Sequence, residues 1–320
     1  LLIALFSDQI TQKLPESSGY LQWFALMLFS GFLFELVKVQ FRIKHNNKAF
    51  AISDITYSVL LVVSVTAGAY FIGVQGYVLA YIISPAAVAL VAWARLSSTS
   101  RHEAVTLEIN SGKFWWYGIF SSLGNVTTEL LIAIDIILIG NLLLNSELVT
   151  AYKYVTLLPF SLLFLSHVYM STYFVTLAEK MEDQGFIKRF IRNYFWMFLG
   201  ICLAIVLGSW LLGSWFLGIL DPEYSTYFEV FMILIGGVCG VLLIRGLFGN
   251  LISAIGRAQA NFGISLLALG LNLVLNYQLI PQYGIKGAAI TSASIMWFTA
   301  LLSAGVFYFY FGGERRNEKG

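Results

Sequence analysis

The stretch NLVLNYQLIPQYGIKGAAITSASI, residues 272–295, predicts two apolar helices joined by a tight bend. Pro281 and Gly284 are expected to end the first helix, and the second begins with a run of small residues. Asn272 and Asn276 are four positions apart and therefore share one helix face. Small residues let membrane helices approach closely, and asparagine hydrogen-bonds across such contacts. Four residues are therefore expected to pack helices together, or else to line an aqueous cavity: Asn272, Asn276, Gly284 and Gly287.

The composition of the chain predicts a membrane protein. The chain has 320 residues, of which 58% are hydrophobic and 11% are charged, and its mean hydropathy is +0.79. Soluble domains carry roughly 25% charged residues, so these values indicate a polytopic membrane protein. Cys202 and Cys239 both lie inside apolar runs and give no redox or metal signal.

Nine apolar segments are long enough to cross a bilayer, which takes about 20 residues. They cover residues 19–38, 51–72, 74–95, 114–143, 149–178, 190–219, 228–254, 260–280 and 286–311. The predicted fold class is therefore all-α, a polytopic transmembrane bundle. Most of the 19 lysines and arginines fall in alternate loops. The positive-inside rule then places the C-terminus in the cytoplasm.

A weak internal repeat predicts two lobes. GVQGYVLAYIISPAAVALVAW begins at Gly73 and GIKGAAITSASIMWFTALLSA begins at Gly284, and each follows an apolar helix after a short turn. Internal repeats are common in transporters. Residues 1–6 are expected to be the remnant of another helix in an N-terminally truncated chain. The predicted parts are the end of an N-lobe at 1–95, a cytoplasmic linker at 96–113, a six-helix C-lobe at 114–312 and a cytoplasmic tail at 313–320.

Two stretches resemble helix hairpins of a known family. Residues 272–295 and AIDIILIGNLLLNSELVTAYKYVTLLPF, residues 133–160, are similar to hairpins of Wzx-type polysaccharide flippases. These flippases belong to the multidrug/oligosaccharidyl-lipid/polysaccharide (MOP) exporter superfamily. The resemblance implies a MATE-like fold, with two pseudo-symmetric six-helix lobes around a central cavity that opens alternately to either side of the membrane.

The resemblance also implies a cargo and partners. The expected cargo is an undecaprenyl-pyrophosphate-linked oligosaccharide, such as an O-antigen unit for lipopolysaccharide. The expected location is the bacterial inner membrane. Expected partners are this lipid-linked oligosaccharide, membrane lipids, H⁺ or Na⁺ as the coupling ion, and the polysaccharide polymerase machinery.

Arg245 is the clearest candidate for cargo binding, because ionisable side chains at membrane depth are costly and mark functional sites. It lies in the apolar sequence GVLLIRGLFGN, and an arginine can bind pyrophosphate bidentately. The alternative is a structural ion pair with Glu129 or Asp135. Lys153 is a second cationic candidate, although its place near the outer end of a helix favours snorkelling to the interface.

Polar residues of segment 114–143 are candidates for a cavity wall and for ion coupling. Asn125 and Glu129 lie one turn apart and form a polar stripe. Asp135 follows Glu129 at an angle of roughly 120° around a helix of 3.6 residues per turn, so the two acids face different directions. Either acid could exchange a proton or hold sodium, and either could instead be the partner of Arg245.

His167 and Tyr169 lie in the middle of another segment. His167 is a candidate proton relay, and a hydrogen-bonded packing histidine is the favoured alternative. Tyr169 has Tyr173 one turn further along. Tyr169 could stack on a sugar ring, and core packing is the more ordinary role.

The sequence lacks enzyme signatures. It has no His/Cys/Asp cluster with metal-ligand spacing and no G-x-x-x-x-G-K-[ST] phosphate loop. We therefore expect no enzyme activity, no cofactor, no metal and no nucleic-acid partner. The competing functions are a multidrug or cation antiporter and a peptidoglycan-precursor flippase of the same superfamily. A membrane glycosyltransferase or polymerase is less favoured.

Overall fold

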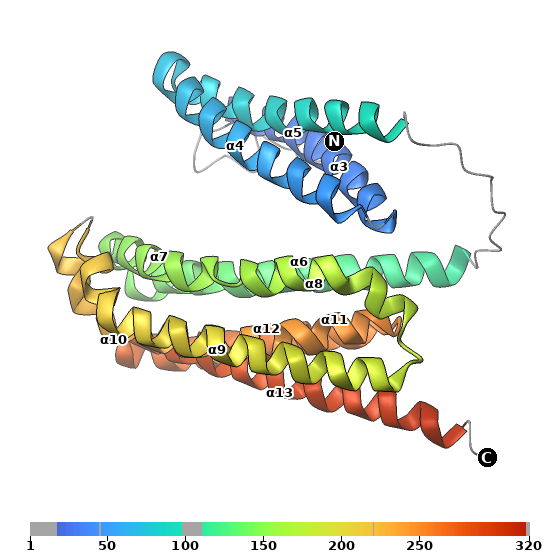
Figure 1. Cartoon of the computed structure of the whole chain (residues 1–320). Coiled ribbons are helices and arrows are strands. Elements are labelled where there is room, and N and C mark those ends of the chain that lie inside the picture. Colours follow the sequence, from blue (N-terminus) through green and yellow to red (C-terminus); the bar gives the residue numbers. More distant parts are fainter. Residues whose placement is uncertain (1–17, 45, 98–110, 220, 318–320) are drawn as a thin grey trace. The chain divides into compact units, whose positions relative to one another are not determined.

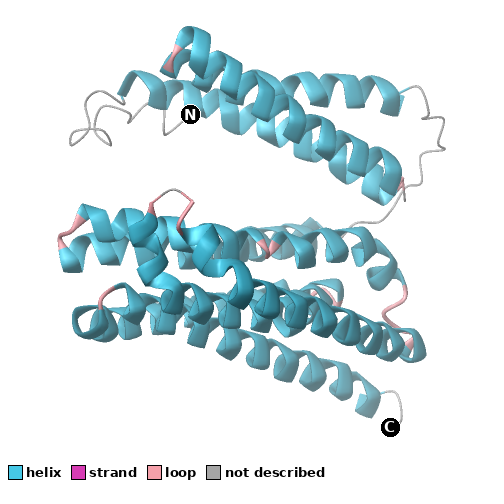
Figure 2. Cartoon of the chain, turned by 60° about the vertical axis from the view of Figure 1, so that its left-hand side comes forward, coloured by secondary structure: helices cyan, strands magenta, loops and turns pink. Residues whose placement is uncertain are grey.

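A computed structural model describes residues 18–44, 46–97, 111–219 and 221–317 of the chain. In this part the only regular secondary structure is helical (Figure 2). The helices form two compact units, one of three helices and one that holds the rest (Figure 1). The all-α prediction is confirmed.

The first unit contains α3 (Ser18–Ile43), α4 (Asn47–Ile72) and α5 (Val74–Ser97). Asn46 caps α4, because its side chain accepts a hydrogen bond from the Ala49 backbone N–H at 3.0 Å. Gly73 ends α4 with φ of 76°, a value that favours glycine. A Cβ at Gly76 would overlap the backbone of Gly68, so α4 and α5 meet closely just beyond this turn.

The second unit begins with α6 (Ser111–Leu143), α7 (Ser146–Ser161), α8 (Phe164–Glu179) and α9 (Gln184–Leu217). A 3₁₀ turn, η2 (Pro222–Tyr227), leads into α10 (Phe228–Gly240). A π-helical turn, η3 (Val241–Arg245), joins α10 to α11 (Gly246–Ala254). The unit ends with the long helices α12 (Ala258–Tyr283) and α13 (Ile285–Asn317). α12 packs against both α6 and α13, so polar residues of three helices can meet at its surface.

Eight helical segments in the described residues are long and apolar enough to cross a membrane. α7 with α8, and η2 to α11, each count as one of these segments. α3 forms where the remaining predicted segment, 19–38, was expected. The chain is therefore an integral membrane protein. Two of the predicted helices are interrupted: segment 149–178 breaks between α7 and α8, and segment 228–254 contains the π-helical turn η3.

The hairpin between α12 and α13 differs in one detail from the sequence prediction. Pro281 does not end α12, which continues to Tyr283. Gly284 makes the turn, with φ of 59°. A Cβ at Gly287 would overlap the carbonyl oxygen of Leu279, so the two helices are in backbone contact directly after the bend. Proline removes one backbone donor but is tolerated in a membrane helix where neighbouring groups compensate.

Candidate functional site

Asp135 lies at the centre of a buried polar cluster in the second unit. Its side chain, on α6, has no exposed surface. Asn272 and Asn276 of α12 both donate to Asp135 Oδ1, at 3.2 and 2.7 Å. Tyr152 of α7 donates to Oδ2 at 3.1 Å, and Ser292 of α13 donates to the same oxygen. Four helices therefore meet around one carboxylate.

The carboxylate of Asp135 has no cationic partner among the described residues. Burying an ion is expensive unless a charge partner or several hydrogen bonds compensate. Two buried oxygens of the neighbouring helices also lack a donor within the described protein, Asn276 Oδ1 and Thr291 Oγ1. Asn276, whose Oδ1 lacks a donor, is itself bound to Asp135, so the cluster is chemically suited to take up a proton or a small hard cation.

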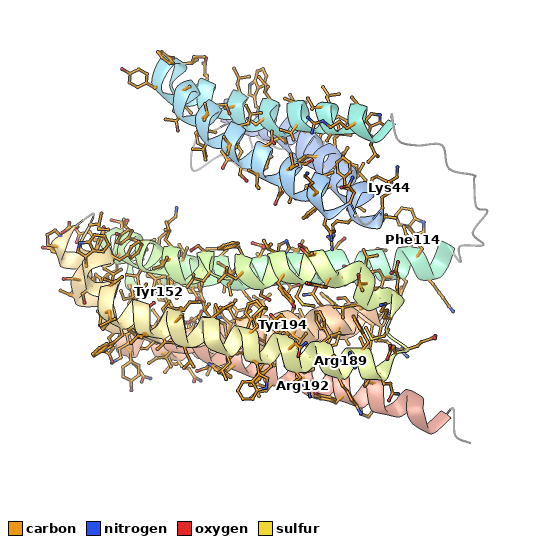
Figure 3. The ribbon with its side chains drawn as sticks, viewed as in Figure 1. Lys44, Phe114, Tyr152, Arg189, Arg192 and Tyr194 are labelled. Atoms are coloured by element: carbon orange, nitrogen blue, oxygen red, sulfur yellow. The ribbon has the colours of Figure 1, made fainter. Side chains whose placement is uncertain are left out.

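Tyr152 and Asn276 are almost inaccessible, with 1% and 0% of their surface exposed. Figure 3 shows Tyr152 within the second unit, among the side chains that fill it. Asn276 Nδ2 also donates to Asn272 Oδ1 at 2.9 Å, which fixes the two amides relative to each other. Both asparagines therefore hydrogen-bond across the contact between α12 and α6.

Arg245 forms a second polar centre, at the end of the π-helical turn η3. Its Nη1 donates to Asn261 Oδ1 at 2.9 Å and to Ser303 Oγ at 2.8 Å. Its Nη2 donates to Ser265 Oγ at 3.4 Å. All three partners are neutral. The predicted alternative of an ion pair with Glu129 or Asp135 is wrong, because Asp135 is satisfied by four neutral donors and Glu129 is exposed.

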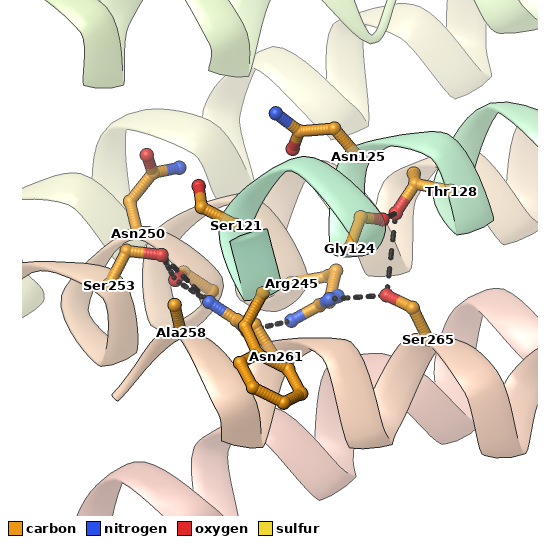
Figure 4. Close-up of a pocket in the computed structure, with 12 residues that line it drawn as sticks. Ser121, Gly124, Asn125, Thr128, Arg245, Asn250, Ser253, Ala258, Asn261 and Ser265 are labelled. Carbon is orange, nitrogen blue, oxygen red and sulfur yellow. Dashed lines mark hydrogen bonds between the residues drawn. The ribbon is translucent and has the colours of Figure 1, made fainter. Parts of the chain in front are cut away.

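A polar cavity of about 190 Å³ opens beside Arg245 (Figure 4). Hydroxyl and amide side chains dominate its wall, and Arg245 is the only charged side chain among the residues that line it. α6, α11 and α12 all contribute to the wall, together with Arg245. The polar lining residues are Ser121, Asn125, Thr128, Asn250, Ser253, Asn261 and Ser265.

A second cavity, of about 110 Å³, lies on another side of Arg245. Its wall is mostly apolar but includes Thr128, Arg245 and Ser265, which also line the polar cavity. Asn272 and Ser292, two of the four donors to Asp135, belong to its wall as well. The second cavity therefore lies between the Arg245 centre and the Asp135 cluster, and the polar cavity adjoins it at Arg245.

The structure brings some of the predicted site residues together and separates others. Arg245 and Asn125 line the same cavity. Glu129 is exposed and Asp135 is buried, so the prediction that they occupy different faces of α6 is confirmed. Lys153 is exposed on α7 and lines neither cavity.

His167 and Tyr169 occupy different environments on α8. The His167 side chain is exposed and makes no hydrogen bond within the described part of the chain, so the favoured alternative of a hydrogen-bonded packing side chain is wrong. Tyr169 lies in an aromatic cluster, with ring centroids 4.9 Å from Tyr173 and 5.5 Å from Tyr194. Tyr194 is buried and its hydroxyl donates to the Leu242 carbonyl at 2.8 Å. These contacts correspond to the core-packing role of Tyr169.

Sequence reasoning missed several residues that complete the two centres. Ser292 and Tyr152 hold Asp135, and Asn261 and Ser303 hold Arg245. The only sequence signal for Ser292 is its place in the small-residue run after Gly284. Ser303 and Tyr152 resemble many other hydroxyl-bearing residues of the chain, and only the tertiary fold selects them.

Comparison with known proteins gives one relative in sequence. No protein-family model matches the chain. A segment of 136 residues is 33% identical to the capsular polysaccharide biosynthesis protein CapF of Staphylococcus aureus. This match covers 41% of the chain and spans 32% of the length of CapF.

Solved structures share the fold at low sequence identity. A mutant of the Vibrio cholerae MATE transporter VcmN is 14% identical with a TM-score of 0.83, and the match covers 98% of this chain and 75% of VcmN. An outward-facing multidrug resistance MATE transporter of the MOP superfamily is 13% identical with a TM-score of 0.69, covering 98% and 76%. The lipid II flippase MurJ is 12% identical with a TM-score of 0.56, covering 92% and 61%. The chain therefore has the fold of MOP-superfamily transporters, as predicted.

Proposed function

We propose that this chain, which has the MOP transporter fold, belongs to a flippase that moves a lipid-linked oligosaccharide across the bacterial cytoplasmic membrane. The cargo is an oligosaccharide on undecaprenyl pyrophosphate, used for O-antigen or another surface polysaccharide. The observation that carries this proposal is the polar cavity, in which one arginine stands among hydroxyl and amide groups. The partial match to CapF, a capsular polysaccharide biosynthesis protein, supports the same class of cargo.

The chemistry of the cavity suits an anionic headgroup attached to sugars. A guanidinium carries five N–H groups, and the described partners of Arg245 accept three hydrogen bonds. The remaining N–H groups are available to a phosphate oxygen. Amide and hydroxyl side chains, such as Asn125 and Ser121, match the hydroxyl groups of a sugar in both donor and acceptor capacity. Lys153, Tyr169 and His167 lie outside this cavity and are weaker candidates for contact with cargo.

A coupling ion binds at Asp135 in this proposal. The chain has no phosphate loop for nucleotide hydrolysis, and the buried acid is suited to a proton or Na⁺. Binding of either would neutralise a charge on which α6, α7, α12 and α13 converge. A change in that charge is therefore able to shift the packing of the whole unit between two states of alternating access.

The second candidate cargo is a peptidoglycan precursor, which is favoured by the likeness in fold to the lipid II flippase MurJ. A multidrug antiporter is less favoured, although the fold is more similar to that of the MATE transporter VcmN, with a TM-score of 0.83 against 0.56 for MurJ. Cationic drugs require an acidic site, whereas the described cavity has a single, positive charge.

The remaining parts of the proposal are an N-lobe that contains residues 1–95, a linker at 96–113, a C-lobe at 114–312, and a cytoplasmic C-terminus. A polysaccharide polymerase is the proposed downstream partner.

Complementation tests this function. The whole gene that encodes the chain is expressed in a bacterium that lacks its own flippase and carries the native glycan pathway, and surface glycan is measured. Restored glycan that is lost in Arg245→Ala, at equal membrane abundance, is expected. Arg192→Ala, which removes an exposed arginine of α9, is the matched control and is expected to retain export. Absence of glycan with the unchanged protein correctly inserted would reject the proposed cargo.

A further inference from the structure

Three side chains separate the polar cavity from the second cavity. Thr128 of α6, Arg245 of η3 and Ser265 of α12 line both spaces. The contacts between them are long: Thr128 Oγ1 lies 3.3 Å from Ser265 Oγ, and Arg245 Nη2 lies 3.4 Å from the same oxygen (Figure 4). Hydrogen bonds of this length are weaker than the 2.8 and 2.9 Å bonds that hold Nη1. The boundary is thus the least constrained part of the Arg245 centre.

The far end of the second cavity reaches the Asp135 cluster. Asn272 and Ser292 line this cavity, and each donates directly to the carboxylate of Asp135. A single layer of side chains therefore separates the cavity from the buried acid. Thr299, further along α13, provides a hydroxyl in the same wall. The side chains of Asn272 and Ser292 thus stand between a small ion in this cavity and Asp135.

Electrostatics makes the boundary selective. Arg245 is the only charged side chain among the residues that line either cavity. A cation that moves from the polar cavity toward Asp135 has to pass within a few ångströms of the guanidinium. Two like charges about 5 Å apart, at an effective dielectric constant of about 20, repel each other enough to lower the occupancy of the cation more than about a hundredfold. The same cation experiences almost none of this repulsion once an anion is paired with Arg245.

We propose that Arg245, with Thr128 and Ser265, is an electrostatic gate on the path of the coupling ion to Asp135, and that the anionic group of the cargo opens it. The proposal rests on the proposed function and adds a regulation of the same site. An unliganded Arg245 excludes cations from the second cavity. A bound phosphate neutralises the guanidinium, and the coupling ion then reaches Asp135. Ion uptake is thereby tied to the presence of cargo.

Charge-selective labelling tests the gate without knowledge of the ion or the sugar. Thr299, which is 7% exposed, is replaced by cysteine in a protein that carries Cys202→Ala and Cys239→Ala. The reporter thiol reacts with a small cationic methanethiosulfonate, the ethylammonium derivative, and with its neutral methyl analogue. The ratio of the two rates reports the potential in the second cavity. Met296→Cys, in the same wall, repeats the measurement at a second position.

The gate predicts two changes in this ratio. Arg245→Gln raises the cationic-to-neutral ratio about tenfold or more, because it removes the repulsive charge. Inorganic pyrophosphate raises the ratio in the protein with Arg245 and leaves it unchanged in Arg245→Gln. Arg192→Gln, on the exposed face of α9, is the matched control and has no effect. An unchanged ratio in Arg245→Gln, or failure of the neutral reagent to react at both positions, overturns the gate.

The labelling experiment and the complementation experiment can fail independently of each other. If Arg245→Gln abolishes glycan export and the labelling ratio does not change, Arg245 acts on cargo and the gate is rejected. If the ratio rises as predicted but the unchanged protein exports no glycan, the gate stands and the cargo is wrong. A thermal midpoint of the parent reporter protein equal to that of the unchanged protein verifies that the labelled molecules are folded.

Discussion

Asn276 of α12 donates a hydrogen bond of 2.7 Å to Asp135 of α6, across 141 positions of the chain. Asp135 is completely buried and its described partners are neutral. A soluble protein would usually place a cation beside such an acid. In a protein with a transporter fold, an uncompensated acid at membrane depth is a functional site by default. The relationship between these two residues is therefore the basis for predictions on both stability and coupling.

Replacement of Asp135 by asparagine is expected to abolish ion-dependent transport without lowering the stability of the protein. Asp135→Asn keeps the size of the side chain and removes the buried charge, so the thermal midpoint of the purified protein should not fall. Ion-dependent export should be lost, because an amide neither releases a proton nor neutralises a cation. Glu129→Gln, on the exposed face of the same helix, is the control and should keep ion dependence. Retained ion dependence in Asp135→Asn would move the coupling site elsewhere.

Removal of a hydrogen-bond donor to Asp135, by contrast, is expected to lower the stability of the protein. Asn276→Leu leaves the carboxylate with three of its four donors and should lower the free energy of unfolding by about 1–3 kcal/mol. The double variant Asn276→Leu with Asp135→Leu should recover part of this loss, since no charge is then buried. Thermal melting in detergent measures both. A double variant that is less stable than the single one would show that packing, rather than charge, dominates the cluster.

The helices were predictable because the apolar segments are long and the turns carry clear signals. Gly73 and Gly284 illustrate this point: both lie in the repeated G-x-x-G pattern, and both adopt positive φ at a helix end. Asn272 and Asn276 were predictable as a pair because their spacing puts them on one helix face. Their partner was not, because no local pattern relates them to Asp135. The weak internal repeat therefore predicted the hairpin but not the contacts of its asparagines with Asp135.

The environment of Arg245 depends on contacts that local sequence does not encode. Its apolar neighbours correctly marked it as exceptional, but they also suggested an acidic partner. Its actual partners, Asn261 and Ser303, lie 16 and 58 positions away. The π-helical turn that ends at Arg245 has no distinctive composition. π-helical turns often occur at functional sites. Because this turn has no sequence signature, only the three-dimensional structure reveals it.

The shape of the guanidinium should matter as much as its charge. Arg245→Lys keeps the positive charge but replaces a planar fork by a single ammonium group, which cannot hold Asn261 and Ser303 and still bind a phosphate bidentately. We expect glycan export to fall about tenfold or more, equivalent to about 1.4 kcal/mol. In the labelling assay Arg245→Lys should still exclude the cationic reagent. Normal export in Arg245→Lys would argue against bidentate phosphate recognition.

The close contact at Gly287 predicts a difference between two glycines of the same hairpin. A methyl group at Gly287 would overlap the Leu279 carbonyl, which is backbone and cannot rotate away. Gly287→Ala should therefore force α12 and α13 apart at the turn and destabilise the protein by about 1–3 kcal/mol. At Gly270, within α12, an added Cβ would have no atom within 4 Å apart from its chain neighbours and the backbone of its own helix. Gly270→Ala should be neutral or stabilising, because alanine favours the helix by up to about 1 kcal/mol. Thermal unfolding of the two variants at equal detergent concentration distinguishes them. Equal midpoints would show that α12 and α13 can move apart at the turn without a loss of stability.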